Sequence, residues 1–299
     1  QAAWVKPFGS RSRADVAPSR VFSMAHGNVS DLAFLGVLAI VIQWLAFPDT
    51  LFQDVGPFKP QFEEKTKDLE AVIKLGAGIL LTIGMAFSGV SWNPINGKMG
   101  GFAGLITIGV TGFHSLRADG YAFVLKPFYV YLAVLLVGSI HISFFGANPL
   151  VKKLDADTKN NHGNFSDKIC LGLLVCAGAA AFYPDHLFMD LGLLKAQLAA
   201  TSPDLAFMVK FVACLLFMWA MILSGVKWNP INGKMAGLGG FICAGTTSYG
   251  TWKADGGVFV PRVFYVYATL IFLSALHIFA FPSNPVPPKS QDSQARKKA

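Results

Sequence analysis

The octapeptide Trp92-Asn93-Pro94-Ile95-Asn96-Gly97-Lys98-Met99 occurs a second time 136 residues later, as residues 228–235. The match extends outward from it without a gap, so that residues 26–150 align with residues 162–286. Of these 125 aligned positions, 52 are identical. Similarity at one fixed offset indicates a tandem duplication, and the two copies are therefore expected to share one fold.

The composition is that of a membrane protein. Apolar residues make up 53% of the 299 residues and charged residues only 14%, against roughly 25% charged residues in an average soluble domain. Several apolar stretches approach the ~20 residues that cross a bilayer core. The formal charge is +8, but the basic residues are scattered in loops and tails, which argues against a nucleic-acid partner. We expect an all-α integral membrane protein surrounded by lipid.

Four transmembrane helices are predicted in each copy, about eight in all. The predicted spans are 32–47, 71–90, 99–116, 121–145, 168–183, 207–226, 235–252 and 257–281. An even number per copy gives both copies the same orientation, related by a pseudo-twofold axis along the membrane normal. The chain then divides into a polar basic arm, a first repeat, a linker, a second repeat and a basic tail, at 1–29, 30–150, 151–165, 166–286 and 287–299.

The third span of each copy is rich in glycine. In the first copy these residues are Gly97, Gly101, Gly104 and Gly109. Small residues allow helices to approach closely where lipid provides no hydrophobic drive between them. We expect the third span to be the packing centre, buried between its neighbours or placed at the contact between the copies.

Basic residues also predict the orientation. Of the 25 Lys and Arg residues, 15 fall on the side of the two termini and 8 on the other side. The positive-inside rule places both termini on the stromal or matrix side of an organellar inner or thylakoid membrane. The chain begins at Gln1, and its first 29 residues are basic with almost no acids, which agrees with a trimmed import sequence.

The repeated octapeptide is the first candidate site. Asn-Pro and Asn-Gly both favour turns, and the expected structure is a tight hairpin with the Trp and Lys side chains anchored at headgroup level. Alternatively, the loop dips inward so that helix N-terminal amides face a ligand. The candidate residues are Trp92, Asn93, Asn96 and Lys98, with Trp228, Asn229, Asn232 and Lys234 in the second copy.

Two pairs of histidines are the second candidate site. His141 and His277 lie late in the fourth spans, and His26 and His162 precede the first spans. Imidazole at these places could ligate the magnesium of a chlorophyll or a haem iron, or relay protons. For any single histidine the favoured interpretation is a structural one, in which the ring bonds to a neighbouring backbone carbonyl or to the Asn-Pro turn. The second spans also carry matched lysines, Lys74 and Lys210, which are expected to extend to the interface.

Other chemistry is not indicated. No span has a carboxylate at its middle, the usual residue of proton- or cation-coupled carriers. The sequence has no phosphate-binding, metalloprotease or serine-hydrolase motif, and its four cysteines have no metal-ligand or disulfide spacing. We therefore expect neither an enzyme nor a metal-ion site.

The favoured hypothesis is a non-catalytic accessory or scaffold subunit of a large organellar energy-transducing membrane complex. A photosystem subunit that binds chlorophyll and carotenoid is preferred, and a respiratory subunit fits nearly as well. The polar tails are then expected to be held by partner subunits. The alternative hypothesis is a small-molecule transporter or channel with a polar site between the two repeats.

Overall fold

The computed structural model describes residues 29–88, 94–144, 165–224 and 230–280, and in these ranges all the regular secondary structure is helical. The α-helices and the two short 3-10 helices are α1 (Val29–Ala46), η1 (Pro48–Leu51), α2 (Lys67–Phe87), α3 (Pro94–Ala118), α4 (Pro127–Phe144), α6 (Phe165–Phe182), η2 (Pro184–Leu187), α7 (Pro203–Leu223), α8 (Pro230–Ala254) and α9 (Val263–Ala280). Each element of the first half begins and ends 136 residues before one of the second half.

Local chemistry explains where the second helix of each half begins and ends. Thr66 precedes α2 and its hydroxyl accepts a hydrogen bond from the amide of Leu69; Ser202 does the same before α7. Such N-caps satisfy amides that have no partner inside the helix. At the other end, the hydroxyls of Ser88 and Ser224 donate to the carbonyls of Met85 and Met221, three residues earlier. Equivalent caps thus give the two helices equal lengths.

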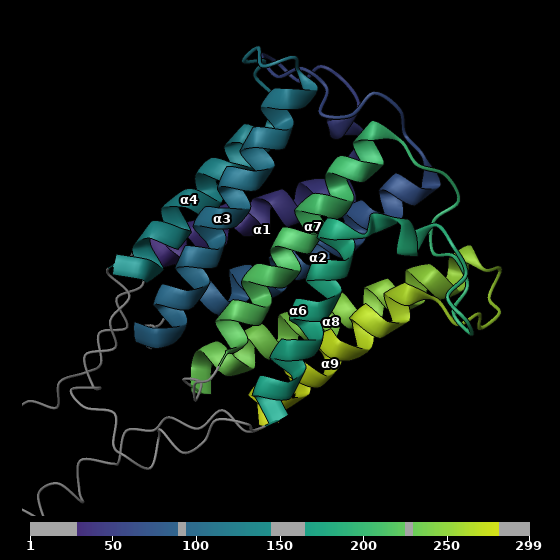
Figure 1. The fold of residues 1–299 in the computed structure, drawn as a ribbon. Coiled ribbons are helices and arrows are strands. Elements are labelled where there is room, and N and C mark those ends of the chain that lie inside the picture. Colours follow the sequence, from purple (N-terminus) through teal and green to yellow (C-terminus); the bar gives the residue numbers. More distant parts are fainter. Residues whose placement is uncertain (1–28, 89–93, 145–164, 225–229, 281–299) are drawn as a thin grey trace, which may run out of the picture.

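Helices α2 and α7 form the centre of the bundle, with α1, α3 and α4 on one side and α6, α8 and α9 on the other (Figure 1). The most apolar part of α2 is 78% buried, against 39% for α3. The prediction that the third span is the packing centre is therefore wrong. The alternative prediction, that the third span lies at the contact between the two halves, is correct. The second helix is more buried because it packs against α1, α7 and α8, whereas α3 packs mainly against α4 and α7 and keeps one face exposed.

The two halves are joined crosswise. Helix α3 packs on α7, and α8 packs on α2, so that each third helix lies against the second helix of the other half. Glycines make the contact close: a Cβ added at Gly78 of α2 would lie 2.7 Å from the sulfur of Cys243 in α8. At Gly100 of α3 it would lie 2.5 Å from Ile222 in α7. The hydroxyl of Thr107 in α3 also donates to the Cys214 carbonyl of α7.

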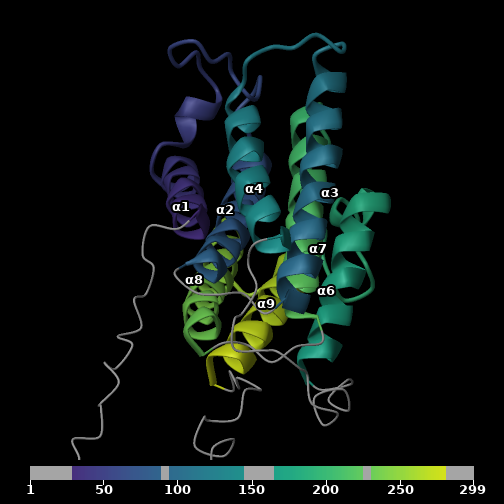
Figure 2. The same cartoon turned by 90° about the vertical axis from the view of Figure 1, so that its left-hand side faces the viewer.

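Five of the described helices are long and apolar enough to cross a membrane: α2, the 97–118 part of α3, α4, α7 and α9. Large apolar side chains cover the outside of the bundle, among them Phe102, Phe144, Leu171, Val175 and Phe182. These features are those of an integral membrane protein. In Figure 2 the connection between α3 and α4 and the segment after η1 lie together at one end of the bundle.

Candidate functional site

The structure places His141 and His277 at matching positions in different halves. Both are half-buried, near the C-terminal ends of α4 and α9. Helix α4 packs against α1 and α3, whereas α9 packs against α6 and α8, so the two imidazoles do not form one site. The ring of His277 lies 5.6 Å from that of Phe165 in α6. His26 and His162 lie outside the described residues.

The last six residues of the repeated octapeptide form the start of a helix in each half rather than a loop. Trp92, Asn93, Trp228 and Asn229 lie outside the described residues, but α3 and α8 begin at the prolines that follow. Proline is tolerated in the first turn because its missing amide would have no helical partner there.

Consequently Asn96 and Asn232 belong to the first turns of α3 and α8, and the turn predicted at Asn-Gly is wrong. The lysines that follow, Lys98 and Lys234, are exposed, whereas the glycines between them and the asparagines are buried. Exposed lysines at a helix start agree with the expected anchoring at headgroup level.

A symmetric polar cap joins the two halves at the end where α2 and α7 begin. The carboxylate of Asp204, in the first turn of α7, accepts a hydrogen bond of 2.7 Å from the backbone amide of Glu63 in the first half. The carboxylate of Asp68, in the first turn of α2, accepts one from the amide of Ala199 in the second half. Each half thus supplies the acceptor for a loop of the other, and acids are also favoured at helix N-termini by the helix dipole.

Two glutamines fix these loops to the neighbouring helices. The side-chain oxygen of Gln61 accepts a hydrogen bond from the backbone amide of Phe128, in the first turn of α4. The backbone amide of Gln61 donates to the carbonyl of Leu51 in η1. Gln197 bonds in the same way to Phe264 and Leu187. Because Gln61 is buried, these bonds satisfy polar groups that would otherwise destabilise the cap.

An ion pair closes the connection between the last two helices of each half. Lys126 and Asp119 are joined at 2.6 Å, and Arg262 and Asp255 at 2.5 Å. The Asp255 side chain is only 7% exposed, and its hydrogen bonds hold the pKa of the Arg262 guanidinium above its usual value. Arg262 also donates to the carbonyl of Ala196. The pair therefore links the α8–α9 connection to the loop that follows η2.

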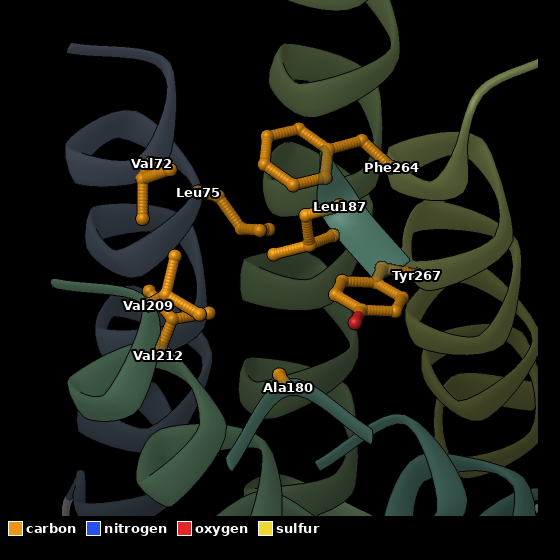
Figure 3. A pocket seen from close by; sticks show the side chains of 8 residues that line it. All are labelled: Val72, Leu75, Ala180, Leu187, Val209, Val212, Phe264 and Tyr267. Atoms are coloured by element: carbon orange, nitrogen blue, oxygen red, sulfur yellow. The ribbon is translucent and has the colours of Figure 1, made fainter. Parts of the chain in front are cut away.

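A small apolar cavity lies where α2 of the first half meets the helices of the second half (Figure 3). Its volume is about 10 Å³, which is the lower limit for one water molecule. It is lined by Val72, Leu75, Ala180, Leu187, Val209, Val212, Phe264 and Tyr267. The only polar atom among these side chains is the Tyr267 hydroxyl, which lies 3.1 Å from the His186 ring. A cavity of this size and lining cannot hold a solute.

In the first half the same place is filled by an indole. Trp44 occupies the position equivalent to Ala180, is fully buried, and stacks on Phe128 with ring centroids 5.5 Å apart. Its neighbour in α2 is Gly76, whose counterpart in α7 is Val212. The large Trp44 and the small Gly76 of the first half thus correspond to the small Ala180 and the larger Val212 of the second half.

The polar cap was not predicted, although the sequence carries a signal for it. Between 61–70 and 197–206 only three residues are identical: a glutamine, an aspartate and a leucine. These are Gln61, Asp68 and Leu69 with their copies. Gln61 attaches the loop to α4, and Asp68 bonds to the other half. Leu69 donates its backbone amide to the N-cap residue Thr66, and its side chain is buried. Identity between diverged repeats therefore marks the cap.

Within the described ranges, no group of three or more His, Cys, Asp or Glu side chains could hold a metal ion. In comparisons with known proteins, no protein-family model, no curated protein and no solved structure matches the chain.

Proposed function

We propose that this protein is a non-catalytic scaffold subunit of a large energy-transducing membrane complex. The observation that carries the proposal is the contrast between its inside and its outside. Glycines bring the halves so close that an added Cβ at Gly78 or Gly100 would overlap the facing helix, which leaves no room for a solute at these two positions. The outer faces, in contrast, expose many large apolar side chains to lipid or to neighbouring subunits.

The proposal includes a tandem duplication with eight membrane spans. The coincident bounds of the helices and the paired hydrogen bonds of the cap support the duplication. Helices α1, α6 and α8 do not meet the length and apolarity of the other five, but α8 packs against α2 and α9, and α6 packs against α7 and α9. Helices packed along membrane-spanning helices share their depth, and helical backbone is suited to that depth.

An organellar inner or thylakoid membrane, with both termini on the stromal or matrix side, is the location that fits the distribution of Lys and Arg. The exposed Lys98 and Lys234, at the starts of α3 and α8, belong to that more basic side. The partners of such a subunit would be lipid and the other subunits of the complex.

Chlorophyll and carotenoid are the proposed ligands, with His141 and His277 as the residues that would hold magnesium. The surroundings fit a large apolar ring: next to His141, α4 exposes Val137, Ile140 and Phe144. Near His277, α9 exposes apolar side chains as well. A bound chlorophyll would supply light absorption and energy transfer, while the chain would fix the position of the pigment and exclude water from it.

The test is an absorption spectrum with pigment extraction, made on the full-length protein isolated in mild detergent. We expect chlorophyll bands, co-purification with other subunits in fixed ratio, and loss of pigment in His141→Leu and His277→Leu, with Lys98→Gln as the control. A colourless protein that is isolated free of other subunits would overturn the proposal. Solute flux in liposomes that is abolished by Asn96→Ala and Asn232→Ala would replace it with the transporter.

A further inference from the structure

Three basic residues lie on the facing helices α3 and α7. His114 and Arg117 lie one turn apart near the end of α3, and Lys210 is in the third turn of α7. None of the ion pairs among the described residues involves any of the three.

The register of the two helices brings these residues to the same level. Helices α3 and α7 run antiparallel, and Gly100 faces Ile222, Gly104 faces Met218, and Thr107 bonds to the carbonyl of Cys214. Each step up α3 therefore corresponds to one step down α7, which places the backbone of Lys210 opposite residue 111. A lysine side chain extended toward the interface reaches the next turn of α3, where His114 lies.

Two buried hydroxyls face the same place. Thr111 and Ser115 follow Thr107 at intervals of four residues, so that they share its α7-facing side of α3. They are 3% and 2% exposed, and their hydroxyls have no hydrogen-bond partner among the described residues. Buried hydroxyls are normally satisfied, so that a group with several acceptor oxygens would complete this surface.

The equivalent place in the other half, at the α2–α8 contact, differs in charge. It keeps the two hydroxyl-bearing positions, as the buried Thr247 and Thr251, and a basic residue, Lys253. Lys74, however, replaces Lys210 and lies 3.8 Å from Glu70, whereas the counterpart of Glu70 in α7 is an alanine. The counterpart of His114 is Gly250. The second place thus lacks the imidazole and has one carboxylate more, although its helices pack in the same antiparallel register.

We propose that the α3–α7 surface formed by His114, Arg117, Lys210, Thr111 and Ser115 binds one phosphate- or sulfate-type oxyanion, carried by an anionic lipid or present as a free ion. Two cationic side chains, an imidazole and two hydroxyls offer the donors that such a group accepts. The exposed rings of Phe113 and Tyr121 lie beside the site, with centroids 6.5 Å apart. Aromatic side chains of this kind are common at headgroup level.

The test measures binding of fluorescent phosphatidylglycerol to the full-length protein in detergent, with phosphatidylcholine as the zwitterionic reference and inorganic phosphate as competitor. We expect one anionic lipid per chain and about tenfold weaker binding for Lys210→Gln or His114→Gly, because each removes a hydrogen-bond donor to the bound oxyanion. Lys210→Arg should retain binding. Lys74→Gln, the matched control in the other half, should leave it unchanged.

A gain-of-site variant makes the test independent of any loss of folding. Glu70→Ala combined with Gly250→His copies the arrangement around Lys210 onto Lys74, and an added Cβ at Gly250 meets no neighbouring atom within 4 Å. We expect two bound lipids per chain. Competition by inorganic phosphate would identify a free ion as an alternative ligand, and its absence would identify a lipid headgroup. Equal loss in Lys74→Gln and Lys210→Gln, or no loss in either, would overturn the proposal.

Discussion

Trp44 and Gly76 fill one place in the first half jointly, and their substitution tests how this half is packed. Trp44 is fully buried, with its ring centroid 5.5 Å from that of Phe128 and 5.9 Å from that of Phe211. Removal of a buried tryptophan costs about 3–5 kcal/mol. We expect about 3 kcal/mol for Trp44→Ala, at the lower end, because the indole N–H has no hydrogen-bond partner in the described part of the chain, and truncation removes this unsatisfied donor.

Gly76→Val should destabilise the protein for the opposite reason. An added Cβ would lie 3.1 Å from the Trp44 ring and 3.3 Å from Val212, and overpacking of this kind costs about 1–3 kcal/mol. Together, however, Trp44→Ala and Gly76→Val reproduce the pair that the second half carries, Ala180 and Val212. We expect the double variant to be about 1–2 kcal/mol more stable than the sum of the single effects, within the range usual for contacting residues.

The assay is reversible unfolding of the full-length protein by SDS in mixed micelles, followed by far-UV circular dichroism, with the four proteins of the double-mutant cycle measured together. Leu32→Ala, an exposed position on the same helix α1, is the control for loss of apolar bulk. Strict additivity of the two substitutions, or a cost below about 1 kcal/mol for Trp44→Ala, would refute the account of this place as one jointly packed unit.

Three further predictions concern the contact between the halves and the cap. In the same assay, Gly78→Val should destabilise the protein by about 1–3 kcal/mol because the added Cβ meets α8. Gly109→Val is the control, since nothing lies within 4 Å of a Cβ added there, and it should have no such effect. Equal destabilisation by the two substitutions would contradict this account. Asp204→Ala should cost about 1 kcal/mol and accelerate hydrogen exchange of the Glu63 amide, and unchanged exchange would refute the bond. Hydrogen bonds from a lysine ammonium and a backbone amide lower the pKa of Asp190 in the folded protein. The stability that Asp190 contributes is therefore present above the pKa of the unfolded state, about 3.9, and is lost as the pH falls through the lower pKa of the folded state. Amide exchange in the loop after η2 should rise at that low pH and not at neutral pH.

The helices themselves could be predicted from the sequence, because their signals are local. The first predicted span ends before Pro48, and α1 ends at Ala46; its copy ends before Pro184, and α6 ends at Phe182. The start of the third helix was placed too late, at residue 99 instead of 94, because the pairs Asn-Pro and Asn-Gly were both interpreted as turns. Proline at a helix start and inside a turn has the same backbone φ, so the dipeptide alone cannot distinguish them.

The packing of helices against one another could not be predicted. Beyond Lys74 in α2 and Lys210 in α7 these helices carry no charged residue, so no face of these parts is marked as the buried one, and in lipid the exposed face is apolar as well. The crosswise contacts of α3 with α7 and α8 with α2 depend on where small residues meet, such as Gly78 with Cys243. Glycine spacing identifies a helix that is closely approached, but not the partner that approaches it.

Comparison of the halves also bears on how many ligands the protein should carry. His141 and His277 occupy equivalent positions with equivalent burial, so a pigment held by one should be matched by a second. The basic surface is different, because His114 and Lys210 have Gly250 and a Glu70-paired Lys74 as counterparts. A duplicated chain in which both ligands were adventitious would bind them in equal numbers at its two halves. Two pigments and one anionic group per chain is the ratio that the two proposals together predict, and pigment extraction combined with native mass spectrometry measures both numbers on one preparation.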